Sequence, residues 1–346
     1  MRSAAYLYPW DVAGDPAAPE LMAGLGVGHV VLAAVYHGIR AMAPRHPVHR
    51  VVSVPHSAAY YPSSFVEPGR WSFTEACTAL REAGLPVHAW MVVNHVDLPG
   101  PVRDNVVNAY GDRYPWALCP ARDAVLDRAV GIATEVADLP GVAGIELEAC
   151  GWFGFDHLGA HDKTSGVPLT AADRDLLSLC FCDACAPSYE DAPELRRRVR
   201  AALDGGAAFD AGDVFGARAT VADRFRAAVV AAIRSRRPDL EILLHTNPLP
   251  SRSTAFTGAD PALAASLVDG RVVNCWTDFA ALHASLQVAG PVYASLLAVA
   301  GMGGRPLADQ VRRAGDAAGI RLYHAGLASG ADLDAIRALR ETGTSG

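Results

Sequence analysis

The chain has 346 residues, of which 51% are hydrophobic and 19% charged, so it can bury a large core. Its net charge of −7 and the lack of any Lys/Arg tract argue against a nucleic-acid partner. No segment is long and apolar enough to cross a membrane, and no signal-peptide-like stretch opens the chain, so we expect a cytoplasmic protein. Seven cysteines, an odd number in a large chain without a signal peptide, argue against a disulfide framework.

Eight short apolar, β-branched runs alternate with helical stretches. The predicted strands are 4–8, 29–36, 86–94, 142–149, 241–247, 271–278, 291–299 and 320–326. The predicted helices between them include 122–139, 219–236, 279–289 and 305–318. Strand–helix alternation predicts parallel strands, and eight such units predict a (β/α)8 TIM barrel. A doubly wound sheet would need a glycine-rich phosphate turn after its first strand, and "YPWDVAGDP" is not one.

Two connections in this pattern are long. Residues 37–85 follow the second predicted strand, and residues 150–240 follow the fourth. The second connection carries a cluster of cysteines and is an insertion into the barrel. We therefore expect residues 1–346 to form one barrel domain with a metal-stabilised insertion after the fourth strand.

The stretch "LCFCDACA" places Cys180, Cys182 and Cys185 within six residues. Tetrahedral zinc needs a fourth ligand, and Cys119 in "PWALCPAR" or Cys150 after the fourth strand could supply it. Four thiolates fill the coordination sphere of Zn²⁺ and leave no position for water, so the ion would be structural. The alternatives are ordinary buried thiols or a redox C-x-x-C pair.

The segment "LCPARDAVLDRAVGIATEVADLPGVAGIELEACG…LCFCDACA", within roughly residues 115–190, resembles the central segment of the glycoside hydrolase family 42 β-galactosidases. That family carries a cysteine before a helix start, a strand ending in Asn-Glu, and a C-Y-C-x-x-C cluster. Its four cysteines bind one structural zinc on a barrel. Other barrel proteins related to glycosidases share the cysteine pattern.

The resemblance implies particular roles for residues of this chain. The zinc ligands would be Cys119, Cys180, Cys182 and Cys185, and Glu148 would be the acid/base glutamate. Leu147 stands where the family has the asparagine, and the predicted seventh strand, "PVYASLLAVAG", has no carboxylate where the family has its nucleophile. The retaining mechanism of the family is therefore not implied.

Two glutamates of "GIELEAC" lie on one side of the predicted fourth strand. Strand alternation places Ile145 and Leu147 toward the helices and Glu146 and Glu148 inside the barrel. Glu148 is nearer the C-terminal end of the strand, where barrel active sites form, and is the predicted general acid. Glu146 is either a second catalytic carboxylate or half of a buried ion pair with an arginine such as Arg321.

The other strand ends are rich in aromatic and polar side chains, which suit a carbohydrate because rings stack on sugar C–H faces and polar groups bind hydroxyls. The predicted substrate-binding residues are Trp10, Asp11, Tyr36, His37, Asn94, His95, Trp152, His157, His245, Asn247, Trp276 and His324. Asp278 is the first candidate for the carboxylate that works with Glu148, followed by Asp11 and Asp156. A retaining pair would be about 5–5.5 Å apart and an inverting pair about 6.5–9.5 Å.

These residues predict a glycoside-hydrolase-like enzyme that acts on a carbohydrate or glycoside. One alternative is a sugar-binding barrel without catalysis. The other is a metal-dependent hydrolase or lyase that uses the histidines of the barrel mouth. A homo-oligomer is compatible with the sequence.

Overall fold

The computed structural model describes residues 2–156, 163, 166, 168–205, 209, 212–248 and 261–342. Eight parallel strands form its central sheet, and β1 pairs with both its neighbours, so that the sheet closes into a barrel. The strands are β1 (Arg2–Leu7), β2 (His29–Tyr36), β6 (Val87–Val92), β9 (Val142–Glu148), β10 (Glu241–His245), β11 (Gly270–Asn274), β12 (Val292–Leu297) and β13 (Gly319–Tyr323). The eight predicted strands and the (β/α)8 barrel are confirmed.

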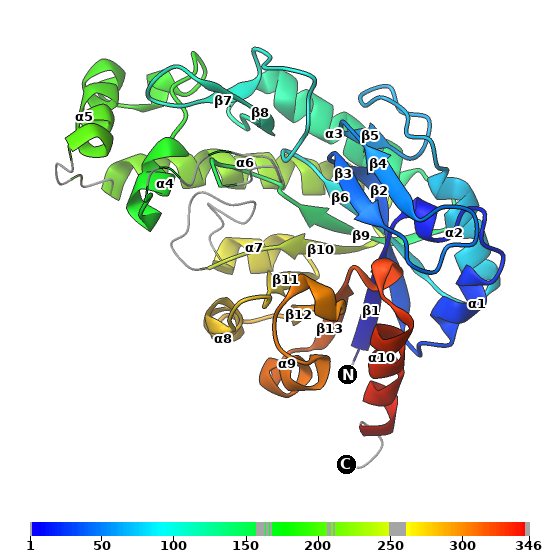
Figure 1. Cartoon of the computed structure of the whole chain (residues 1–346). Coiled ribbons are helices and arrows are strands. Elements are labelled where there is room, and N and C mark those ends of the chain that lie inside the picture. The colour runs from blue at the N-terminus through cyan, green and yellow to red at the C-terminus, as the bar shows by residue number, and fades with distance from the viewer. Residues whose placement is uncertain are drawn as a thin grey trace.

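Each barrel strand is followed by at least one helix (Figure 1). The helices are α1 (Ala18–Ala23), α2 (Phe73–Glu82), α3 (Asp123–Ala137), α4 (Ala171–Leu177), α5 (Ala192–Gly205), α6 (Gly212–Arg236), α7 (Pro261–Leu267), α8 (Ala280–Leu286), α9 (Leu307–Ala314) and α10 (Gly330–Thr342). The four predicted helices correspond to α3, α6, α8 and α9, and α6 begins earlier than predicted. No described helix is long and apolar enough to span a membrane.

The sequence of α2 shows why these segments form helices against the barrel. Ser72 caps its N-terminus by accepting a hydrogen bond from the Glu75 amide at 3.2 Å. Phe73, Cys77 and Leu80 recur at helical spacing and are buried. The helix therefore presents one apolar face to the sheet.

Three connections on the C-terminal side of the barrel strands carry small elements of their own. The connection after β2 contains the hairpin of β3 (Ile39–Met42) and β4 (Val51–Val54), and β5 (Ala58–Ala59) pairs antiparallel with the end of β2. The connection after β6 contains the hairpin of β7 (Asn105–Val107) and β8 (Arg113–Leu118), which the sequence did not predict. The connection after β9 contains α4, α5 and α6, and Figure 1 shows α4 and α5 on the same side of the barrel as β7 and β8.

The inside of the barrel is divided between apolar and polar side chains. Leu243, Val272 and Tyr293 form a buried apolar cluster of their own. Ile145 and Leu147 of β9 are fully buried in the main core, and Glu146 contacts residues from strands across the barrel. The predicted inward direction of Glu146 is therefore confirmed, and the interior is polar near β9.

Candidate active site and metal centre

Glu148 is the last residue of β9 and lies at the C-terminal end of the barrel. Trp90 of the neighbouring strand β6 donates its indole N–H to Glu148 Oε2 at 2.8 Å, and His245 Nδ1 lies 3.9 Å from the same oxygen. Burial raises the pKa of Glu148 above its ordinary value, and the charge of Glu146 adds to this, whereas His245 and the Trp90 hydrogen bond oppose it. Glu148 therefore holds its proton to a higher pH than a solvated glutamate, which is what a general acid needs.

The backbone adopts an unusual conformation directly after the ends of β9 and β13. Ala149, after Glu148, has φ of 50°, and His324, after Tyr323, has φ of 61°. Residues other than glycine adopt this left-handed conformation at a cost, which the surrounding structure must offset. The fold therefore uses strain to turn the chain where β9 and β13 reach the barrel mouth.

Glu146 lies one layer deeper than Glu148 and is completely buried. Arg321 of β13 donates from Nε to Glu146 Oε1 at 2.7 Å, and the Tyr6 hydroxyl of β1 donates to Oε2 at 2.5 Å. Burial alone would raise the pKa of Glu146, but Arg321 and His245 outweigh it and hold the pKa well below its usual range. The predicted ion pair with Arg321 is present, and it keeps Glu146 ionised.

A chain of hydrogen bonds joins this buried pair to Glu148. The single hydroxyl proton of Tyr6 is donated to Glu146, so Tyr6 accepts from His245 Nε2 at 2.9 Å. Nε2 of His245 must then carry a proton. The other ring nitrogen, Nδ1, is the atom that faces Glu148. The buried charges thus fix the tautomer of the histidine beside the candidate acid.

Tyrosines at the C-terminal ends of β1, β2 and β13 form a hydrogen-bonded group near Glu148. The Tyr8 hydroxyl donates to Tyr36 at 3.2 Å and contacts His324 Nδ1 at 3.0 Å, and the hydroxyls of Tyr36 and Tyr323 are 3.5 Å apart. The Trp276 ring lies 4.3 Å from that of Tyr323. Burial raises the pKa of Tyr36 and of Tyr323, and the nearby Glu148 charge contributes to both shifts. Of the predicted residues, His245 and Tyr36 thus lie near Glu148, and Trp276 and His324 each contact Tyr323.

Other predicted residues are held in contacts within the protein. Trp10 is fully buried and stacks on Tyr8 at 4.4 Å. Asn94 donates to the Gly151 carbonyl at 2.8 Å, and Trp152 donates to the Arg218 carbonyl at 2.7 Å. These side chains shape the loops around the mouth, and their contact with a substrate stays a prediction.

A row of stacked rings crosses the ends of β2 and β6 and the loop after β9. His37 lies 4.1 Å from Tyr36 and 3.9 Å from His95, which stacks on Phe153 at 4.2 Å. Asn247 follows β10 and is half-buried. His157 lies outside the described residues.

The candidate partner carboxylates each have another contact. Asp278 is exposed and accepts from the Ala280 amide at 2.9 Å at the start of α8. Asp156 pairs with Arg174 at 2.6 Å. Asp11 accepts from the Tyr8 amide at 2.8 Å, and burial raises its pKa to about 7 against the effects of that hydrogen bond and of Arg45. Within the described residues, the polar contacts of Glu148 are with Trp90 and His245, so the second carboxylate stays a prediction.

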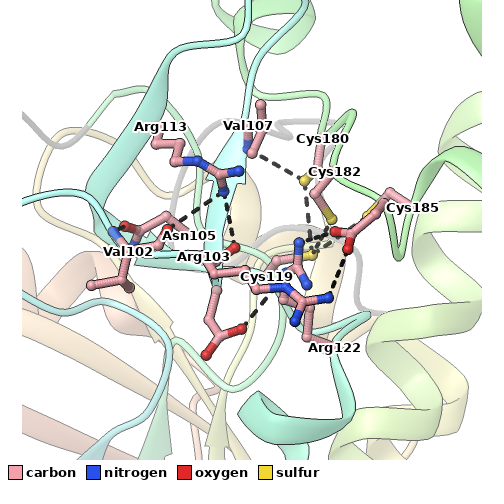
Figure 2. Close-up of polar contacts among 12 residues, drawn as sticks. Val102, Arg103, Asn105, Val107, Arg113, Cys119, Arg122, Cys180, Cys182 and Cys185 are labelled. Atoms are coloured by element: carbon pink, nitrogen blue, oxygen red, sulfur yellow. Dashed lines mark hydrogen bonds and ion pairs between the residues drawn. The ribbon is translucent and has the colours of Figure 1, made fainter.

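Four buried cysteines form a separate cluster, seen in Figure 2. Cys119 Sγ lies 3.8 Å from Cys180, 3.7 Å from Cys182 and 3.4 Å from Cys185. Four sulfurs at about 2.3 Å from a tetrahedral zinc are about 3.8 Å apart, so the cluster has nearly the size of a metal–tetrathiolate site. Cys119, and not Cys150, completes the group. The four thiols are compatible with one bound metal ion.

Buried arginines lie beside these thiols, whose metal complex would be anionic. Arg122 is 7% exposed, pairs with Asp183, and is drawn beside Cys119 in Figure 2. The Arg218 guanidinium lies 4.8 Å from the Trp152 ring centroid. Burial lowers its pKa, and the charges of Tyr189, Cys180 and Cys185 oppose that shift. No nitrogen of the Arg218 guanidinium has a hydrogen-bond partner in the described part of the chain. A nearby negative charge would offset the cost of burying it.

Sequence reasoning missed two members of the Glu148 site. Tyr6 and Trp90 lie within strands rather than at their ends, and each is fully buried. The signal that could have found Trp90 is strand alternation, because His88 and Trp90 follow the inward register opposite Gly144 and Glu146.

The comparisons with known proteins agree with the barrel. No family model and no curated protein sequence matches the chain. The chain is similar to the PgaB (BpsB) glycoside hydrolase domain of Bordetella bronchiseptica, with a TM-score of 0.62 and 15% identity over 97% of each chain. It is also similar to the β-amylase catalytic domain of Paenibacillus polymyxa, with a TM-score of 0.57 and 10% identity over 100% of this chain and 99% of that one.

A third similar structure is a β-galactosidase from Halorubrum lacusprofundi, with a TM-score of 0.54 and 13% identity. The match covers 99% of this chain and 58% of that one. At these identities the likeness establishes the fold, a barrel of the kind found in glycoside hydrolases. Membership of glycoside hydrolase family 42 has no support from a sequence family and stays a resemblance.

Proposed function

We propose that this protein is a glycoside hydrolase and that Glu148 is its general acid/base. The observation that carries the proposal is the environment of Glu148: a carboxyl group at the C-terminal end of a barrel strand, with its pKa raised by burial. A glycosidic oxygen must be protonated as it leaves, and a carboxylic acid with a raised pKa is suited to that step.

The residues around Glu148 suit this chemistry. Trp90 holds one carboxylate oxygen and so orients the group. His245, which is hydrogen-bonded to Tyr6, lies 3.9 Å from the same oxygen, a distance that a small shift or one water molecule would bridge. The aromatic rings of Tyr36, Tyr323 and Trp276 offer surfaces for a sugar. A carbohydrate or glycoside is the proposed substrate.

The test is hydrolysis of a panel of aryl glycosides and oligosaccharides by the wild type and by Glu148→Gln. The wild type should hydrolyse at least one member, and Glu148→Gln should lose about 10²- to 10⁴-fold in rate while its circular dichroism is unchanged. Glu82→Gln, at the exposed end of α2, is the control for the same chemical change. Unchanged turnover in Glu148→Gln would refute the role of this residue.

A sugar-binding barrel without catalysis is the second candidate. The carboxylate whose charge raises the pKa of Glu148 is that of Glu146, which is bound by Arg321 and Tyr6. A hydrolase of the usual two-carboxylate type needs a second group with access to the sugar or to water. Saturable binding of a glycan by the wild type without any turnover would support this candidate over the first.

For the cysteine cluster we propose structural Zn²⁺ bound by four thiolates, which leave no open coordination position. The ion would join the end of β8 to the segment after α4, and so hold the connection after β9. Metal analysis of the purified protein should give about one zinc per chain, and Cys185→Ser should lose most of it. Cys275→Ser, a buried cysteine outside the cluster, should keep its zinc. Equal metal content in both variants would contradict the assignment.

A further inference from the structure

A second polar cluster lies toward the opposite end of the barrel interior from the mouth. His29 is the first residue of β2, His88 is the second residue of β6, and Glu146 is in the middle of β9. One ligand-type atom from each of these residues lies within 4.8 Å of the others. The starts of parallel strands gather at the N-terminal end of a barrel, so the two histidines are separated from the mouth where Glu148 lies.

The two imidazoles of this cluster have nitrogens without partners. The rings of His29 and His88 are 4.2 Å apart, and His88 is 5% exposed. His29 Nε2 and His88 Nδ1 are buried and have no hydrogen-bond partner among the residues that the structure describes. Burial lowers the pKa of both histidines, to about 3 for His29, so both rings are neutral near pH 7. A buried polar nitrogen without a hydrogen-bond partner is unfavourable unless something binds it.

The surrounding backbone makes room for this arrangement. A Cβ at Gly144 would lie 2.7 Å from Cε1 and Nε2 of His88, so only glycine on β9 lets the ring occupy its position. Glu241 on β10 places Oε2 3.6 Å from His88 Nε2 and is one-third exposed at its side chain. The cluster therefore has a second carboxylate on its solvent side.

The charges around the cluster limit how strongly it can bind a cation. Arg321 pairs with Glu146 at 2.7 Å, and Arg2 lies 3.9 Å from Glu241. Each carboxylate thus already faces an arginine. A cation here would depend on the neutral imidazoles more than on net negative charge, and would bind less tightly than at the four thiols.

We propose that His29, His88 and Glu146, with Glu241 beside them, bind one divalent transition-metal cation such as Zn²⁺, Co²⁺ or Ni²⁺. Imidazole nitrogen suits these ions, whereas Mg²⁺ and Ca²⁺ prefer oxygen ligands. Ligands at about 2.0–2.2 Å from a tetrahedral ion are about 3.3–3.6 Å apart, so binding draws the side chains closer than their present separations of up to 4.8 Å. The ion would connect β2, β6 and β9 toward the N-terminal end of the barrel, away from the mouth where Glu148 lies.

The test adds Co²⁺ to the full-length protein after the cysteine cluster has been loaded with zinc. Titration calorimetry and visible absorption should show saturable binding of one further Co²⁺ per chain, with d–d bands and without thiolate charge-transfer absorption. His29→Gln and His88→Gln should each weaken this binding more than about tenfold. His49→Gln, which changes a histidine stacked on His46 at 3.6 Å, should leave the binding unchanged.

Three results would overturn the proposal: no saturable Co²⁺ binding in the wild type, binding in both histidine variants that equals that of the wild type, or charge-transfer absorption that assigns the ion to thiols. If the variants do not fold, anomalous diffraction from wild-type crystals soaked in Co²⁺ decides the question. A peak between His29 and His88 supports the site, and its absence, or a peak at the barrel mouth alone, overturns it.

Discussion

The ion pair between Glu146 and Arg321 gives the sharpest prediction about stability. Glu146 is fully buried and Arg321 is 1% exposed, so removing the arginine leaves a carboxylate in the barrel interior without its counter-charge. Breaking a buried pair in this way costs about 3–5 kcal/mol. We therefore expect Arg321→Met to be strongly destabilised at neutral pH.

The size of this loss should depend on pH, because Glu146 can take up a proton once Arg321 is gone. In the wild type its pKa is depressed, so its ionised form stabilises the fold above the unfolded pKa of about 4.3, and that contribution disappears only as the pH falls below this value. In the variant, we expect burial to raise the pKa of Glu146 beyond the pH range of the assay, so stability is lost as the pH rises through that range. Protonation of the buried group then costs about 1.4 kcal/mol per pH unit above about 4.3, which is about 3.7 kcal/mol at pH 7 and about 1 kcal/mol at pH 5.

Urea unfolding followed by circular dichroism at pH 5, 6 and 7 measures this difference. The difference in the free energy of unfolding between wild type and Arg321→Met should grow by about 2.7 kcal/mol from pH 5 to pH 7. Arg271→Met is the matched control, because Arg271 is equally buried but donates to the backbone carbonyls of Ser285, Val288 and Ala289. The stability that Arg271→Met loses should not vary with pH. A loss in Arg321→Met that is equal at pH 5 and pH 7 would refute the reasoning.

Two further predictions concern the residues around the candidate acid and the metal centre. Trp90→Phe removes a hydrogen bond that favours the ionised form of Glu148, so the apparent pKa of the alkaline limb of the pH–rate profile should rise by about one unit. An unchanged or lowered apparent pKa would contradict the role of Trp90. Arg218→Met removes a buried positive charge beside Cys180 and Cys185, so a chelator should extract the metal about tenfold more readily, as monitored by a zinc-sensitive dye. Arg313→Met, at an exposed position of α9, should release metal like the wild type, and equal release from both variants would count against this electrostatic role.

Much of the fold could be predicted because its signals are local. Most barrel strands are short apolar runs with β-branched residues, and the helices have an apolar period of their own, as α2 shows with Phe73, Cys77 and Leu80. The hairpin of β7 and β8 was not predicted, because "NVV" and "RYPWAL" are too short and irregular to stand out as strands. The cysteine spacing of "LCFCDACA" was equally local, and the cluster that it predicted is present.

The candidate site could be predicted only in part. Strand alternation placed Glu146 and Glu148 inside the barrel, and the position of Glu148 at the strand end made it the candidate acid. Alternation could not select the partner carboxylate. Asp278 ends a predicted strand, but in the structure it is exposed and accepts a hydrogen bond at the start of α8. Whether an aspartate at a strand end faces the mouth or caps a helix depends on the path of the loop.

The sequence by itself determined the barrel, the group of cysteines and the shared inward face of the two glutamates, because each follows from residues close together along the chain. Tertiary structure decided that Cys119 and not Cys150 joins the cluster, and it gave the two glutamates opposite properties. Glu146 meets Arg321, 175 positions away, and its pKa falls, whereas burial raises that of Glu148. Two carboxylates on one face of one strand differ because a pKa depends on the charges and the solvent that the closed barrel places around each of them.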